Sequence, residues 1–260
     1  MSVTITTSLV AAGVPEPVQL VIDGIPSGAS YVVTGVTSGS AWPVPGGVGI
    51  GTGGQVVLID NRTALNVPVT YRVIADGQAW DSTPITVAHG ADLLLQSLDG
   101  RTLVSPVALT PGDFPMELGV IAATHVVPGR SRPVVRYATG ADGGSALSII
   151  TDAAGTAALR SLQRSGQPLV LRLAMPVHDL PPVDLIHVTG WSSVAVGYGT
   201  WRRWSLAYLS IDDPQPSAVL SAFTWDDFDD AMSTRTWTAF DALFAGSTWD
   251  DLDTYPWTQL

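Results

Sequence analysis

The sequence predicts a mainly β protein with two strand-rich domains and a C-terminal extension of short helices. The chain has 26 Gly and 19 Pro among 260 residues, and they separate short runs of Val, Ile, Leu and Thr. Turn residues between short apolar runs are typical of all-β folds. Before residue 213, one segment alone has the spacing of an amphipathic helix. After it, a tryptophan-containing unit returns every twelve residues.

Residues 1–90 are expected to form a β-sandwich of the immunoglobulin or fibronectin type III kind. Their apolar runs are short and are separated by turn residues, as in such sandwiches; the runs begin at Val3, Val18, Tyr31, Gln55 and Val67. The stretch Pro43–Gly54 is so rich in Gly and Pro that we expect a flexible loop there. Tyr71 resembles the tyrosine of strand F in fibronectin type III-like domains, whose hydroxyl bonds back to a nearby loop. An ordinary buried strand tyrosine gives the same pattern, so both interpretations stay open.

Residues 91–212 are expected to form a β-barrel or split barrel with one packed helix. Asp99-Gly100 between two apolar runs predicts a hairpin. The helix is predicted over residues 153–165, because Thr151-Asp152 offers an N-cap and Gly166 a stop. Before it, Ala141–Gly144 predicts a turn between two strands, Pro133–Thr139 and Ser145–Ile150.

Residues 213–260 repeat the unit Thr-Trp-x-x-Phe/Leu. The apolar positions of the repeat are Trp225 and Phe228, Trp237 and Phe240, Trp249 and Leu252, and finally Trp257. Threonine is a good N-cap, and the aspartates that follow suit the first turn of a helix. Each unit therefore predicts a short capped helix, which is marginal alone. We expect the tryptophans to dock, either on the chain's own sandwich or, as we favour, on neighbouring subunits or other proteins.

Charge is concentrated in this extension. It holds nine Asp and one Arg, a net charge of −8, whereas the first 212 residues carry a net −3. An acidic chain without a basic patch is not expected to bind nucleic acid. The sequence has no run of 18 apolar residues and no signal-peptide pattern, so neither a membrane association nor an export signal is expected.

No catalytic constellation is visible, so we expect no enzyme, no metal and no cofactor. The four histidines lack the spacing of metal ligands, and the chain has no cysteine. The G-x-S-x-G motif of serine hydrolases is absent. The paired aspartates of the extension lack the glycine and the closing glutamate of a Ca²⁺ loop.

Two groups of tryptophans are candidates for binding. In a strand, Trp201 and Arg203 would face one way, and Arg202 and Trp204 the other. Such a segment is either a half-buried strand or an intersubunit contact, where Trp and Arg are enriched, and the sequence does not decide between them. Three further tryptophans lie beside Gly, Pro or Asp in expected loops and are candidates for stacking on sugars: Trp42, Trp80 and Trp191.

Several of these segments together resemble minor tail proteins of siphophages that infect actinobacteria. They are Arg136, the Thr151-Asp152 helix start, Gly166-Gln167-Pro168, Trp201-Arg202-Arg203-Trp204 and Ile211-Asp212-Asp213-Pro214. The Thr-Trp-x-x-Phe/Leu extension is similar to C-terminal tails in that family, and Val67–Val73 resembles its N-terminal sandwich. The resemblance implies a structural virion protein at the tail tip that is assembled in the host cytoplasm.

The same resemblance implies a fold like that of distal tail proteins, in which a split barrel with a flanking helix assembles into a ring. The implied partners are copies of the chain and other phage tail proteins. The alternative function is a carbohydrate-binding module that contacts a glycan on the host surface.

Overall fold

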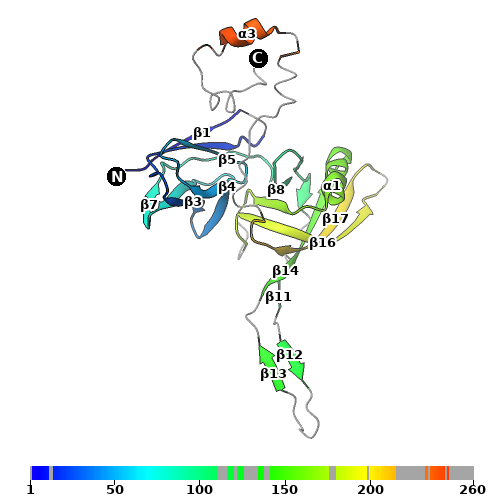
Figure 1. The fold of residues 1–260 in the computed structure, drawn as a ribbon. Coiled ribbons are helices and arrows are strands. Elements are labelled where there is room, and N and C mark those ends of the chain that lie inside the picture. Colours follow the sequence, from blue (N-terminus) through cyan, green and yellow to red (C-terminus); the bar gives the residue numbers. More distant parts are fainter. Residues whose placement is uncertain are drawn as a thin grey trace. The chain divides into compact units, whose positions relative to one another are not determined.

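The structure, a computed structural model, describes residues 2–11, 14–109, 116–119, 122–125, 134–137, 141–175, 180–197, 199–214, 232–233, 235–243 and 245. The fold is mainly β, as predicted, and the sheets that these residues form are open rather than closed. The chain forms two compact units (Figure 1). Unit 1 comprises residues 1–90, 172–183 and 213–260, and unit 2 comprises residues 91–171 and 184–212. The domain ranges expected from the sequence stay a prediction.

Unit 1 contains two sheets. One has the order β1-β2-β5, formed by Thr4–Leu9, Val18–Asp23 and Val56–Asp60. The other has the order β4-β3-β6-β7, formed by Ser40–Ile50, Ser30–Thr37, Thr70–Ala75 and Gln78–Asp81. Alternate residues of β3 and β6 are buried, which is the period of a sheet with one face in the core. The strand runs predicted at Val18, Tyr31, Gln55 and Val67 are confirmed as strands, with shifted ends.

The prediction of a flexible loop over Pro43–Gly54 is wrong, because β4 continues to Ile50 and is largely buried from Trp42 to Gly47. β4 lies at the edge of its sheet, where proline removes few ladder hydrogen bonds. The glycines Gly35 of β3 and Gly49 of β4 leave space that aromatic rings fill. A Cβ on Gly35 would lie 2.4 Å from the indole of Trp42, and a Cβ on Gly49 would lie 2.7 Å from the hydroxyl of Tyr31.

Unit 2 is built on an eight-stranded sheet with the order β10-β14-β17-β16-β15-β8-β9, and β11 also pairs with β14. Its strands are β8 Leu93–Ser97, β9 Leu103–Val104, β10 Ala108–Leu109, β11 Met116–Gly119, β14 Ala141–Thr151, β15 Leu169–Leu173, β16 Val183–Ala195 and β17 Arg202–Ser210. The predicted hairpin around Asp99-Gly100 is confirmed, since β8 pairs antiparallel with β9. β14, β17 and β16 form the antiparallel centre of the sheet.

Helix α1 (Ala153–Ser165) has the bounds that the sequence predicts. Asp152 caps it by accepting a hydrogen bond from the Gly155 amide at 2.8 Å, and Gly166 ends it in the left-handed conformation at φ 63°. Leu159 and Leu162 are buried on its apolar face. The helix lies against β9 and β14, so it covers part of the sheet of unit 2.

The predicted turn over Ala141–Gly144 is wrong, because β14 already begins at Ala141. Gly144 lies opposite both Glu117 and Leu209. Pairing on two sides holds this glycine-rich segment extended despite its weak intrinsic preference for strands. The strand before it, β13 (Val134–Tyr137), pairs instead with β12 (Ala122–His125).

Candidate functional site

The densest polar cluster of unit 1 surrounds the carboxylate of Asp60, which is fully buried. The carboxylate accepts hydrogen bonds from the Trp42 indole at 3.1 Å, the Tyr71 hydroxyl at 2.8 Å and the Thr63 hydroxyl at 3.1 Å. The backbone amide of Arg62 adds a fourth at 2.8 Å. Of the two interpretations of Tyr71, the structure agrees with the one in which its hydroxyl bonds back to a nearby segment.

A buried cation completes the Asp60 cluster. The Arg172 guanidinium donates to the carbonyl of Thr63 at 2.8 Å and to that of Asn61 at 3.0 Å. Burial lowers the pKa of Arg172 to about 10, although the nearby Asp60 and Tyr71 oppose that shift. Burial, followed by the charge of Asp60, raises the pKa of Tyr71 well above its ordinary value. The arginine thus stays protonated and the phenol neutral near pH 7, and both have their bonds satisfied, as in a structural cluster.

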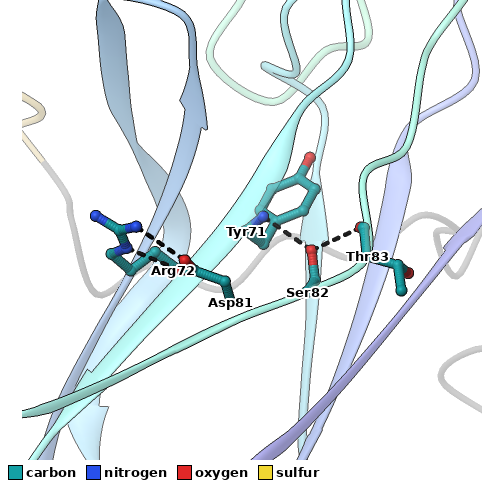
Figure 2. A network of polar contacts seen from close by, with 5 residues as sticks. All are labelled: Tyr71, Arg72, Asp81, Ser82 and Thr83. Atoms are coloured by element: carbon teal, nitrogen blue, oxygen red, sulfur yellow. Dashed lines mark hydrogen bonds and ion pairs between the residues drawn. The ribbon is translucent and has the colours of Figure 1, made fainter.

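Polar contacts also fasten strand β6 to the chain that follows it (Figure 2). The Tyr71 amide donates to the Ser82 hydroxyl at 2.9 Å, and that hydroxyl donates to the Thr83 carbonyl at 2.9 Å. Next to them, Arg72 binds both oxygens of Asp81, at 2.7 and 2.8 Å. The Arg72 hydrogen bonds lower the pKa of Asp81. Because this pair is exposed, it adds little to stability, and the contacts position the β6–β7 hairpin.

The tryptophans considered for sugar stacking do not lie in loops. Trp42 lies in β4 with 2% of its surface exposed, so its ring cannot stack on a sugar, and this interpretation is wrong. Trp80 and Trp191 are half-buried members of β7 and β16. The rings of Trp191 and Trp204 form a T-shaped pair, with ring centroids 6.4 Å apart and an interplanar angle of 88°. The Trp191 ring therefore already packs on another aromatic ring of unit 2.

The Trp201–Trp204 segment divides between two faces, as the alternation predicts. Trp204 is 4% exposed and donates from its indole to the Thr151 hydroxyl at 3.1 Å. Arg202 donates to the Ser193 hydroxyl at 2.9 Å. Trp201 and Arg203 are both exposed, Trp201 to 49%. The segment is therefore a buried anchor on one side and an exposed surface on the other, and its role as an interface stays a prediction.

Two valines that the sequence analysis missed lie beside these exposed residues. Val194, 59% exposed, lies opposite Arg203 in the antiparallel pair of β16 and β17. Val196, 37% exposed, follows two residues later, and its amide donates to the Trp201 carbonyl at 3.0 Å. We call Val194, Val196, Trp201 and Arg203 the tip patch, because they flank the turn that joins the two strands. No pattern within one strand marks the valines, because only the register of β16 against β17 brings them beside Trp201 and Arg203.

The described part of the C-terminal extension contains one repeat unit. Helix α3 (Trp237–Leu243) begins after Thr236, whose hydroxyl accepts a hydrogen bond from the Ala239 amide at 3.3 Å. The predicted threonine cap and short helix are thus confirmed for this unit, and Phe240 is half-buried in it. The other docking residues lie outside the described residues: Trp225, Phe228, Trp249, Leu252 and Trp257. For Trp237, only the backbone is described.

In the part of the chain that the structure describes, no group of three or more His, Asp or Glu side chains is placed to hold a metal ion. None of the helices in that part of the chain has the length and hydropathy to cross a bilayer. The described surface feature with the composition of a binding site is the tip patch.

Comparison with known proteins gives no family or relative for this chain: no family model matches it, and no curated protein matches it.

Proposed function

We propose that the protein is a structural component of a siphophage tail tip, a minor or distal tail protein that assembles with copies of itself and with other tail proteins. The tip patch carries the proposal. An exposed tryptophan, two exposed valines and an arginine on one hairpin have the composition of a protein–protein interface. The resemblance of the Trp201–Trp204 segment and of the extension to minor tail proteins supplies the setting, a virion assembled in the host cytoplasm.

The finer architecture is part of the same proposal. We assign unit 1 to the immunoglobulin or fibronectin III-like sandwiches, supported by its sheets of three and four strands and by the Tyr71–Asp60 hydrogen bond. We assign unit 2 to the split-barrel class with a flanking helix, supported by its antiparallel centre and by α1. Both assignments suit a scaffold that presents surfaces rather than one that encloses a substrate.

The extension is the second docking element. Its capped unit at α3 supports a chain of short helices, each with an aromatic side, that bind repeated partner sites. The test removes residues 215–260 and keeps Asp213, because the Asp213 side chain is only 3% exposed and pairs with Arg62. We expect the shortened chain to keep the unfolding midpoint of the full chain and to be missing from purified particles.

Immunogold electron microscopy of particles made with the full chain should label the tail tip. Label on the capsid, or none on any particle, would overturn the proposed function. Incorporation of the shortened chain at the full level would remove the role of the extension and leave the rest of the proposal standing.

A further inference from the structure

The tip patch has apolar surface that its own sheet does not cover. Trp201, Val194 and Val196 are 49%, 59% and 37% exposed, and the two-residue alternation of the β16–β17 pair places them on one side with Arg203. The opposite side is filled, since Trp204 is buried against Thr151 and Trp191. The buried anchor holds the hairpin while the exposed side stays available.

The patch is also positively charged. Its charge is that of Arg203, which makes no ion pair with any residue that the structure describes. Elsewhere in the same residues, Arg62, Arg72 and Arg101 each pair with an aspartate. The partner that fits the patch therefore offers an apolar group together with carboxylates.

One segment of the chain has this chemistry. In the extension, Trp225-Asp226-Asp227-Phe228 and Trp249-Asp250-Asp251-Leu252 join an aromatic residue to two carboxylates, within a region of net charge −8. The described repeat unit at α3, which has no paired aspartates, starts a capped helix, and we expect the same start for the two Trp-Asp-Asp units. On one turn of helix, Trp and the residue three positions later share a side, and the aspartates lie next to them.

We propose that the tip patch of one copy binds the Trp-Asp-Asp units of the C-terminal extension of another copy. Within one chain the extension starts from Asp213, which Arg62 binds in unit 1, whereas the patch belongs to unit 2. Each copy thus offers one patch and one extension. Such a head-to-tail contact closes into a ring or grows into a longer chain of subunits. The inference rests on the proposed function in one respect: it takes the patch and the extension as docking elements and names each as the partner of the other.

Analytical ultracentrifugation of the purified full chain over a range of concentrations tests the contact. We expect self-association that weakens as salt is added. The Arg203→Glu variant should weaken association by about tenfold or more, as expected for a central interface arginine. The variant with Asp226, Asp227, Asp250 and Asp251 all changed to Asn should do the same. Arg160→Glu, which makes the same charge change on the exposed side of α1, is the matched control and should associate like the unchanged chain.

Mixing the two defective chains gives the sharpest result. The Arg203→Glu chain keeps a working extension with two Trp-Asp-Asp units, and the four-Asn chain keeps a working patch, so the mixture should form complexes of one Arg203→Glu chain with one or two four-Asn chains and nothing larger. A monomeric unchanged chain, association that survives both changes, or a mixture that stays monomeric would each overturn the proposal. Should Arg203→Glu fail to fold, Val194→Ser at the neighbouring exposed position replaces it under the same expectations.

The outcome is separable from that of the proposed function. Head-to-tail association by a chain that is missing from virions would refute the tail-tip role and keep this contact. A chain found at the tail tip whose association ignores both changes would refute the contact alone.

Discussion

The indole nitrogen of Trp42 donates a hydrogen bond to the carboxylate of Asp60 across 3.1 Å, and this bond joins the two sheets of unit 1. Trp42 lies in β4 of one sheet and Asp60 in β5 of the other. Tyr71, in the same sheet as Trp42, reaches the same carboxylate at 2.8 Å. A polar atom thus holds the sheets together where an apolar side chain is usual, and satisfied bonds offset the cost of burying it.

The first prediction concerns that carboxylate. Asp60→Ala should lower the free energy of unfolding by about 3–5 kcal/mol, because it leaves four buried donors without their acceptor and removes the negative charge that favours the buried Arg172 cation. Urea unfolding followed by tryptophan fluorescence measures the change. The exposed Asp92→Ala variant is the control, and an equal midpoint for the two variants would contradict the prediction.

The second prediction concerns a glycine in front of the same indole. Gly35→Ala should destabilise the protein by about 1–3 kcal/mol, since the new methyl group would lie 2.4 Å from the Trp42 ring and force it aside. Gly90→Ala places a methyl group in open space and should leave the thermal midpoint unchanged. Calorimetry that finds Gly35→Ala as stable as Gly90→Ala would show that the ring has room.

The third prediction concerns the start of the C-terminal extension. Arg62 and Asp213 form an ion pair at 2.5 Å, with side chains only 4% and 3% exposed. Asp213→Ala should cost about 3–5 kcal/mol, because it leaves a buried guanidinium without its carboxylate. The neighbouring exposed Asp212→Ala is matched in sequence and should cost little. Denaturant unfolding of the two variants measures both losses of unfolding free energy. Equal losses would contradict the prediction, because they would mean that the Arg62–Asp213 pair is exposed to solvent.

The fourth prediction concerns pH. Burial, followed by the charge of Arg172, lowers the pKa of His89 below its ordinary value of about 6.5. As pH falls below that value, the unfolded chain takes up a proton that the folded chain resists, so His89 contributes a loss of stability toward pH 5. His89→Gln should remove this loss and flatten the decline between pH 7 and pH 5. Thermal midpoints that decline equally in both proteins would contradict the assignment.

Local signals in the sequence were sufficient for some elements. Helix α1 was predicted to its final residue because its cap at Asp152 and its stop at Gly166 act within a few residues. The β8–β9 hairpin was predicted by Asp99-Gly100 for the same reason. The Thr236 cap of α3 also depends only on neighbours three residues away.

Long-range packing was beyond those signals. The glycines around β4 look like a loop until Trp42 and Tyr31 are placed over Gly35 and Gly49. Arg172 interrupts an apolar strand, and nothing near it in sequence shows that its partners lie at residues 61 and 63, more than a hundred positions earlier. Trp42 was misjudged as exposed for the same reason, because its acceptor, Asp60, lies on another strand.

The candidate site was predicted in part. Strand alternation separated Trp201 and Arg203 from Arg202 and Trp204, and the structure keeps that division. Val194 and Val196 join the exposed pair only through the register of β16 against β17, which no single strand reveals. Alternation within β17 thus predicted the patch residues of that strand, whereas the valines of β16 are identified only by its register against β17.

The route of the chain between its units has a mechanical consequence. Residues 1–90, 172–183 and 213–260 all belong to unit 1, so the chain passes from unit 1 into unit 2 and back twice. A force applied between β1 and Asp213, which Arg62 binds, is carried first through unit 1, and it stretches unit 2 only after unit 1 has given way. In the head-to-tail assembly proposed above, by contrast, tension between neighbouring copies enters at the patch, so it loads unit 2 directly.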